Sequence, residues 1–383
     1  MIILLLDMDG VLLEPQGYHR ALVDTVKAIG RSLGFQKVEV RPEDIVAFEA
    51  AGISSEWESA AACAALMLVR RWQQNAEIAF PANLAPCCEP SPGLNAPDFE
   101  AFAHSLDKIN STELTALQRI ETAVIEQAPD LSPGQVRSLQ NLIRNATAAE
   151  QSLLHRTFQE FVLGSQIYAE VYSYPAALNT DSYLLRFDRP NLSPIEQAEL
   201  RQWLVHKERA AAVLTLRPSQ SPGHQVFSTP EAELGAQHAG LGEAPIAGYG
   251  GLLWLGQKWG INPRSFAKPS PVHALTALRL ALNDPLEEAL ITSARLVKDD
   301  DDDGGWKRLN GAQGVIFEDT SAGLKSLAAA QKALRKHHVY LDVELNGITS
   351  DPKKRRALES AGANVYPSLS DALRTAGILS LFS

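Results

Sequence analysis

Apolar residues along this chain form two patterns, short unbroken runs and helical stripes. Ile2–Leu6 is an unbroken run of five apolar residues, which is typical of a strand buried on both faces of a sheet. Similar runs predict strands at 210–216, 314–317, 339–345 and 363–366. Helical stripes lie between these later runs, at about 229–239, 249–259, 271–282, 284–297, 321–335 and 352–361. Because strands alternate with helices, the expected fold class is α/β, with a doubly wound parallel sheet.

Residues 14–205 have a different pattern, which is helical almost throughout. A Pro-rich connector at 81–97 interrupts it. Since a lone strand cannot bury itself, the first strand must join the later ones in one sheet. The sequence therefore predicts an α/β core of residues 1–13 and 206–383, with a large all-helical domain of residues 14–205 inserted after the first strand. The helices expected in this domain are 18–33, 42–50, 56–73, 98–128, 132–146, 147–172 and 194–206.

Composition narrows the class of protein. The length of 383 residues favours two domains, and 45% hydrophobic with 21% charged residues is ordinary for a globular protein. A net charge of −10 without a Lys/Arg cluster argues against a nucleic-acid partner. The three cysteines form neither a disulfide framework nor a zinc motif, and no segment has the length of a membrane span. We expect a cytoplasmic protein without a membrane partner; its oligomeric state does not follow from the sequence.

Two carboxylates follow the first strand directly, in Asp7-Met8-Asp9-Gly10. Side chains two apart on an extended segment point the same way, so both acids are expected at the carboxyl end of the sheet, where open α/β sheets bind ligands. Two like charges this close need a cation or a shared proton, and a divalent ion held by oxygens meets that need. An acidic turn after a strand is the alternative that this motif alone leaves open.

Further polar groups are expected at the same edge of the sheet. Thr215 ends the second predicted strand, Lys268 precedes a helix in Lys268-Pro269-Ser270-Pro271, and Glu318-Asp319 ends the third strand. Each alone is also explained by turn chemistry, a surface lysine or a helix cap. Together, at strand ends and helix starts, they indicate a site.

These motifs resemble those of the haloacid dehalogenase (HAD) superfamily, in its phosphotransferase branch. The four elements are Asp7-Met8-Asp9-Gly10-Val11, the strand ending in Thr215, Lys268 in its Pro-Ser-Pro setting, and Phe317-Glu318-Asp319-Thr320-Ser321-Ala322-Gly323-Leu324. The last is close to the form in phosphoglycolate-phosphatase-like and β-phosphoglucomutase-like members. The helical insertion occupies the place of the superfamily's C1 cap.

The resemblance implies a Mg²⁺-dependent phosphohydrolase that acts on a small phosphorylated metabolite. Asp7 would be the nucleophile and Asp9 the general acid and base. Thr215 would donate a hydrogen bond to an oxygen of the transferred phosphoryl group, and Lys268 would neutralise charge on the nucleophile and on the phosphate. Mg²⁺ would be held by Asp7, the Asp9 backbone carbonyl and Asp319, with Glu318 assisting directly or through water.

Substrate contacts are expected from both domains. Arg217 could bind substrate phosphate or cap the strand end. In the insertion, Ala51-Gly52-Ile53-Ser54-Ser55-Glu56-Trp57 resembles a substrate-facing loop of a HAD subgroup, which makes Ser54, Ser55 and Glu56 candidate contacts.

Two other functions stay open at this point. A phosphomutase of the β-phosphoglucomutase type shares every motif, and a non-catalytic binding protein could use the same scaffold. The run Asp299–Asp303 begins like a calcium loop, but the twelfth position is Asn310 where Glu is needed, so we expect a solvated loop there.

Overall fold

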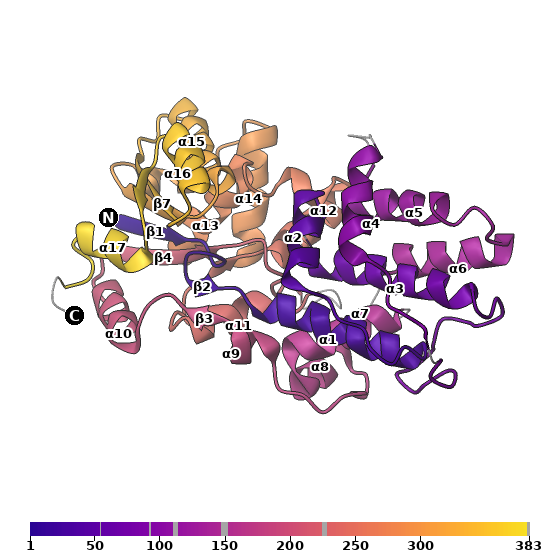
Figure 1. The fold of residues 1–383 in the computed structure, drawn as a ribbon. Coiled ribbons are helices and arrows are strands. Elements are labelled where there is room, and N and C mark those ends of the chain that lie inside the picture. The colour runs from indigo at the N-terminus through magenta and orange to yellow at the C-terminus, as the bar shows by residue number, and fades with distance from the viewer. Residues whose placement is uncertain (54, 92, 110–113, 147–151, 224–227, 381–383) are drawn as a thin grey trace. The chain divides into compact units, whose positions relative to one another are not determined.

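The structure is a computed structural model that describes residues 1–383 except 54, 92, 110–113, 147–151, 224–227 and 381–383. It divides the chain into two compact units (Figure 1). One consists of Met1–Pro15 and Asp188–Ser383, and the other of Gln16–Phe187. In the described part of the chain, no helix combines the length and the apolar character that a membrane crossing requires.

The first unit contains a six-stranded, entirely parallel sheet in the order β5-β4-β1-β6-β7-β8. Counted along the chain, this is the order 3-2-1-4-5-6 of a doubly wound, Rossmann-like sheet, so the predicted α/β class is confirmed. The strand predicted at 339–345 begins and ends three residues later, as β7. The edge strand β5 has only two residues and was too short to predict. The bounds are β1 Ile2–Leu6, β4 Arg209–Leu214, β5 Ile246–Ala247, β6 Gln313–Glu318, β7 Asp342–Ile348 and β8 Asn364–Tyr366.

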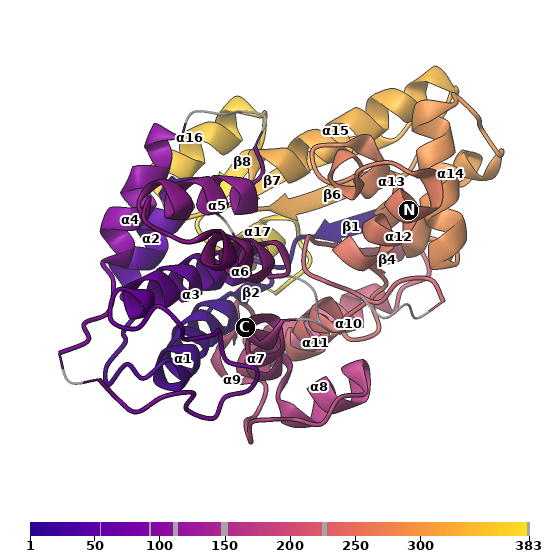
Figure 2. The same cartoon turned by 90° about the vertical axis from the view of Figure 1, so that its right-hand side faces the viewer.

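The central strand β1 is apolar without interruption because helices cover both faces of the sheet. Ile3 and Leu5 pack with α13, α14 and α15, whereas Leu4 and Leu6 pack with α10, α11 and α17. Figure 2 shows α13, α14 and α15 on one side of β1 and β4, with α10 and α11 on the other. The helices of this unit are α10 Pro194–Leu204, α11 Glu231–His238, α12 Tyr249–Trp259, α13 Pro271–Ala281, α14 Leu286–Lys298, α15 Ser321–Lys336, α16 Pro352–Ser360 and α17 Leu369–Thr375, with 3₁₀ helices at Pro263–Ser265 and Gly305–Leu309.

Residues 188–205 belong to this α/β unit, although their helical pattern had placed them in the insertion. The reason is packing: Leu192 and Leu200 are buried in the same core as Leu4 and Leu6. A short antiparallel ribbon also joins the two ends of the unit's interrupted chain. It consists of β2 (Leu13–Glu14) and β3 (Arg189–Pro190).

In its described residues, the second unit consists of helices joined by loops and contains no strand. Its central helix α1 packs against α3, α7 and α9. The helix predicted over 98–128 is divided into three segments, and that predicted over 147–172 is divided at Gly164, where φ is 81°. The bounds are α1 Gly17–Ser32, α2 Pro42–Ala50, α3 Glu56–Trp72, α4 Phe99–Ser105, a 3₁₀ turn Leu106–Lys108, α5 Ala116–Glu126, α6 Pro133–Arg144, α7 Leu153–Leu163, α8 Ser165–Tyr172 and α9 Tyr183–Phe187.

Candidate active site

The strand order reverses at β1, which has β4 on one side and β6 on the other. Ligands of doubly wound sheets bind outside the carboxyl ends of the strands at such a point. Asp7 directly follows β1, while Glu318 ends β6 and Asp319 follows it. The in-register pairing of Leu6 with Phe317 brings these residues together.

A buried ammonium group joins two of these carboxylates. Lys268 Nζ donates to Asp7 Oδ1 at 2.8 Å and to Glu318 Oε2 at 2.7 Å. The three side chains are at most 9% exposed. Burial raises the pKa of Asp7 well above its ordinary value and Glu318 adds to this effect, whereas Lys268 opposes it. Burial alone would lower the pKa of Lys268, but Asp7 and Glu318 reverse that and raise it.

A second lysine, from α16, pairs with the third carboxylate. Lys354 Nζ lies 2.7 Å from Asp319 Oδ2. Burial and Asp7 raise the pKa of Asp319, and Lys354 works against them. Sequence reasoning missed Lys354, because it stands in the basic run 353–356 and nothing in that run distinguishes one member from the others.

Two glycines leave the space that these acids occupy. Gly10 has φ of 78°, and a Cβ there would lie 2.8 Å from Cγ of Asp319. Gly323, in the first turn of α15, is closer still: a Cβ would lie 1.7 Å from Oε2 of Glu318. Side chains at either position would displace an acidic group, so the glycines of both motifs are required by the site.

The donor set suits a hard divalent cation. Asp7, Glu318 and Asp319 each offer one carboxylate oxygen, and these oxygens lie within 4.8 Å of one another. Oxygen ligands of this kind are those that Mg²⁺ prefers. Glu318 is also held by protein groups, since its Oε1 accepts hydrogen bonds from the amide and hydroxyl of Thr320 at 3.1 and 2.8 Å.

The side chain of Asp9 pairs with Arg217. The sequence had led us to expect a cation shared by Asp7 and Asp9. Nε of Arg217 donates to both carboxylate oxygens of Asp9, at 3.0 and 3.1 Å. Nη2 of Arg217 donates to Asp9 and also to Asp188 Oδ2, the latter at 2.8 Å. Arg217 therefore binds two carboxylates rather than merely capping the end of β4. Asp188 was not predicted, since it lies far from every motif in the sequence.

Thr215 directly follows β4, next to β1. It is fully buried, its amide donates to Ala247 O at 3.0 Å, and its hydroxyl accepts the amide of Arg217 at 3.1 Å. The hydroxyl proton is thereby left to be donated elsewhere.

The candidate contacts in the insertion belong to the helical unit. Ser55 precedes α3 and Glu56 is its first residue, with Glu56 Oε1 lying 3.5 Å from His19 Nε2. Ser54 lies outside the described residues.

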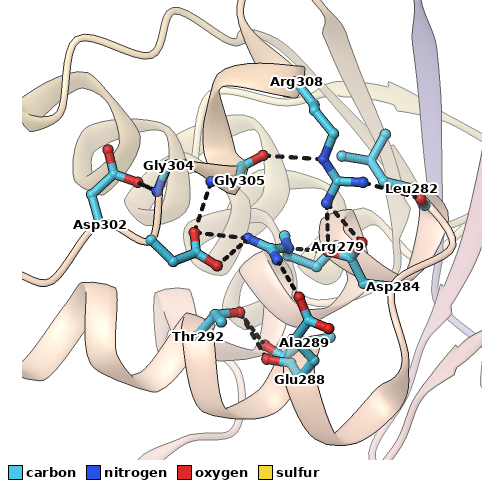
Figure 3. Close-up of polar contacts among 11 residues, drawn as sticks. Arg279, Leu282, Asp284, Glu288, Ala289, Thr292, Asp302, Gly304, Gly305 and Arg308 are labelled. Carbon is cyan, nitrogen blue, oxygen red and sulfur yellow. Dashed lines mark hydrogen bonds and ion pairs between the residues drawn. The ribbon is translucent and has the colours of Figure 1, made fainter.

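The last residue of the aspartate run is bound by α13, while Asp299, Asp300 and Asp301 are exposed, as expected of a solvated loop. Figure 3 shows Arg279 at the centre of these contacts. Arg279 Nη1 donates to both carboxylate oxygens of Asp303 at 3.1 Å, and the same guanidinium also contacts Asp284 and Glu288. Asp303 in turn accepts the amide of Gly305 at 2.9 Å. A buried arginine thus pairs with the end of the run.

No family model and no curated protein matches this chain. Among solved structures, it is similar to a protein determined by X-ray crystallography as Northeast Structural Genomics Consortium target ZR25. That likeness has a TM-score of 0.64 and 16% identity and covers 98% of both chains, which shows a shared fold. The phosphatase Tt82 from Thermococcus thioreducens is more distant, with a TM-score of 0.44 and 15% identity over 94% of this chain and 99% of Tt82.

Proposed function

We propose that this protein is a Mg²⁺-dependent phosphohydrolase of the HAD type, which hydrolyses phosphate monoesters of a small metabolite. The observation that carries the proposal is the buried group of Asp7, Lys268 and Glu318 with Asp319 beside it, at the reversal of strand order. A carboxylate nucleophile, a fixed ammonium and a cation site are what phosphoryl transfer through an aspartyl phosphate requires.

Asp7 is the proposed nucleophile and Asp9 the proton carrier. In the first step an oxygen of Asp7 attacks phosphorus, the bond from phosphorus to the leaving oxygen breaks, and that oxygen takes a proton from Asp9. In the second step Asp9 takes a proton from water, whose oxygen attacks phosphorus. The bond between Asp7 and phosphorus then breaks and releases inorganic phosphate.

Lys268 and Thr215 stabilise charge in this scheme. The Lys268 ammonium is held 2.8 Å from the nucleophile's Oδ1, so it favours the ionised form of Asp7 and can balance charge on the phosphoryl oxygens. The Thr215 hydroxyl supplies a hydrogen-bond donor. Loss of one such donor is expected to cost about 10²–10³ in rate.

Asp7 and Asp319 would hold Mg²⁺, with Glu318 assisting and the Asp9 carbonyl as a further ligand. A bound Mg²⁺ supplies positive charge to the phosphoryl oxygens and lowers the pKa of its ligands. That effect would offset the burial that raises the pKa of Asp7.

The helical unit, Gln16–Phe187, is proposed to act as a cap that selects the substrate. Ser54, Ser55 and Glu56 are its proposed substrate contacts. Arg217 remains a candidate contact for substrate phosphate, and its Nε and Nη2 donate to Asp9 and Asp188.

The deciding experiment measures phosphate release from a panel of sugar phosphates, nucleotides, phosphoglycolate and aryl phosphates, with Mg²⁺ and with EDTA. Wild-type protein should turn over at least one ester only with Mg²⁺, and Asp7→Asn should abolish turnover with an unchanged circular dichroism spectrum. Asp342→Asn is the matched control, because Asp342 is exposed at the amino end of β7.

Three results would contradict the proposal or change it. Wild-type activity in Asp7→Asn would overturn the mechanism, and the absence of turnover on the whole panel would favour a binding protein. Isomerisation of a sugar phosphate that depends on a bisphosphate, without steady phosphate release, would identify a mutase.

A further inference from the structure

Arg217 is buried between two carboxylates that come from distant parts of the chain. Its side chain is 1% exposed, that of Asp188 is 0% exposed and that of Asp9 is 40% exposed. Burying a guanidinium is costly unless it is paired, and Asp188 supplies a second, fully buried carboxylate. The burial of Arg217 therefore does not depend on Asp9 alone.

The surroundings of Arg217 fix its direction. Its amide donates to the hydroxyl of Thr215 at 3.1 Å, which sets the turn after β4. Gly235 of α11 leaves room for the guanidinium, because a Cβ there would lie 3.2 Å from Arg217 Nη1 and 2.5 Å from Met8 Sδ. His238, three residues after Gly235 on α11, contacts the backbone carbonyl of Asp188 through Nε2 at 3.0 Å.

The two carboxylates lie on the segments that lead into β2 and β3. Asp9 precedes β2 and Asp188 precedes β3. Asn191 ties the same segments together, since its amide donates to Leu12 O and its Nδ2 to Val11 O, both at 2.9 Å. Arg217 thus joins the segment that carries Asp9 to the segment by which the chain returns to the α/β unit.

We propose that Arg217, anchored by Asp188, is a positioning residue that holds Asp9 in the orientation needed for proton transfer to the leaving group; this rests on the function proposed above. A side chain as exposed as that of Asp9 has several staggered rotamers available. The Nε/Nη2 edge of a guanidinium fixes both the place and the plane of a carboxylate, which a single point charge does not. Because the proposed role of Arg217 is exercised through Asp9, its removal should slow most those substrates whose leaving group needs a proton.

The test compares two substrates that differ in that need. p-Nitrophenyl phosphate has a leaving group that departs as a stable anion, whereas glycerol phosphate releases an alkoxide that must be protonated. General acid catalysis is worth about 10²–10⁴ in rate. Arg217→Met should therefore lower kcat for glycerol phosphate at least about tenfold more than kcat for p-nitrophenyl phosphate, with little change in KM.

Additional variants separate positioning from folding. Arg217→Lys keeps the charge but not the two-point contact. Like Asp188→Asn, it should lower kcat for glycerol phosphate more than for p-nitrophenyl phosphate, but by a smaller factor than Arg217→Met. If Arg217→Met does not fold, the pair Arg217→Met/Asp188→Asn removes both the buried cation and one buried anion. Arg209→Met is the matched control, since Arg209 lies at the amino end of β4 against Trp203 and should show no selectivity.

The outcomes decide between this role and others. Asp9→Asn should show the full difference in kcat loss between the two substrates. Combining it with Arg217→Met should not increase that difference. Equal losses on both substrates would mean that Arg217 is only structural, and a gain in activity would mean that it restrains Asp9. If wild-type protein hydrolysed neither substrate nor any other ester, the proposed function itself would fail, which is a distinct result.

Discussion

Removal of the Lys268 ammonium should destabilise the α/β unit strongly. Its ammonium lies 2.8 Å from Asp7 Oδ1 and 2.7 Å from Glu318 Oε2. Lys268→Met keeps the length of the side chain and removes the charge. Two buried carboxylates would then face each other without a cation.

Removing one partner of a buried ion pair costs about 3–5 kcal/mol. For a folding unit of about 200 residues, such as the α/β unit, this corresponds to a fall in Tm of roughly 6–20 °C. The loss should depend on pH. Asp7 already has a pKa raised above 3.8 by burial and Glu318, and without Lys268 that pKa rises further. When a carboxyl group has a higher pKa in the folded than in the unfolded state, raising the pH between these two pKa values lowers the free energy of unfolding. The difference from wild type should therefore grow from pH 4.5 to pH 7.5.

The assay is thermal unfolding followed by circular dichroism at both pH values, in EDTA so that no metal replaces the ammonium. Lys258→Met is the matched control, because Lys258 and Glu287 form an exposed pair at 3.1 Å that should be worth at most about 1 kcal/mol. If Lys268→Met cost no more than this control, or if its cost did not shrink at pH 4.5, the stated balance of charges would be refuted.

Two other substitutions test the surroundings of the site. Burial and Lys268 lower the pKa of the buried His273 to about 3. The free energy of unfolding of wild-type protein should therefore fall by up to a few kcal/mol as pH falls from about 6.5 toward 3. The reason is that the imidazole of this histidine takes up a proton freely only in the unfolded chain. His273→Gln should flatten this dependence in urea midpoints measured at pH 7.5 and 4.5; an unchanged slope would contradict the assignment. Lys354→Met should tighten Mg²⁺ binding to the apoprotein in calorimetry by about fivefold, because the ammonium at Asp319 no longer competes. Lys353→Met on the same helix is its control, and equal affinities in both variants would exclude competition.

Much of the α/β unit could be predicted because burial on both faces of a sheet leaves a direct mark on the sequence. The run Ile2–Leu6 is a central strand, and Asp7 follows it at the edge where the sheet order reverses. The two-residue strand Ile246–Ala247 could not be predicted, since so short a segment has no periodicity. Residues 194–206 were recognised as a helix, but a helical stripe does not say which core it faces.

The sequence by itself therefore determined five of the strands of the sheet and the acids and lysine expected at its carboxyl edge, because these depend on local patterns and on the rules of parallel sheets. The pairing of Asp7 with Lys268 was expected from the resemblance. Only the tertiary structure decided that Asp9 pairs with Arg217 and Asp319 with Lys354. The physical reason is that an ion pair forms between groups that packing brings within about 4 Å, whatever their separation along the chain. Asp9 and Arg217 are 208 residues apart, and no local pattern records their contact.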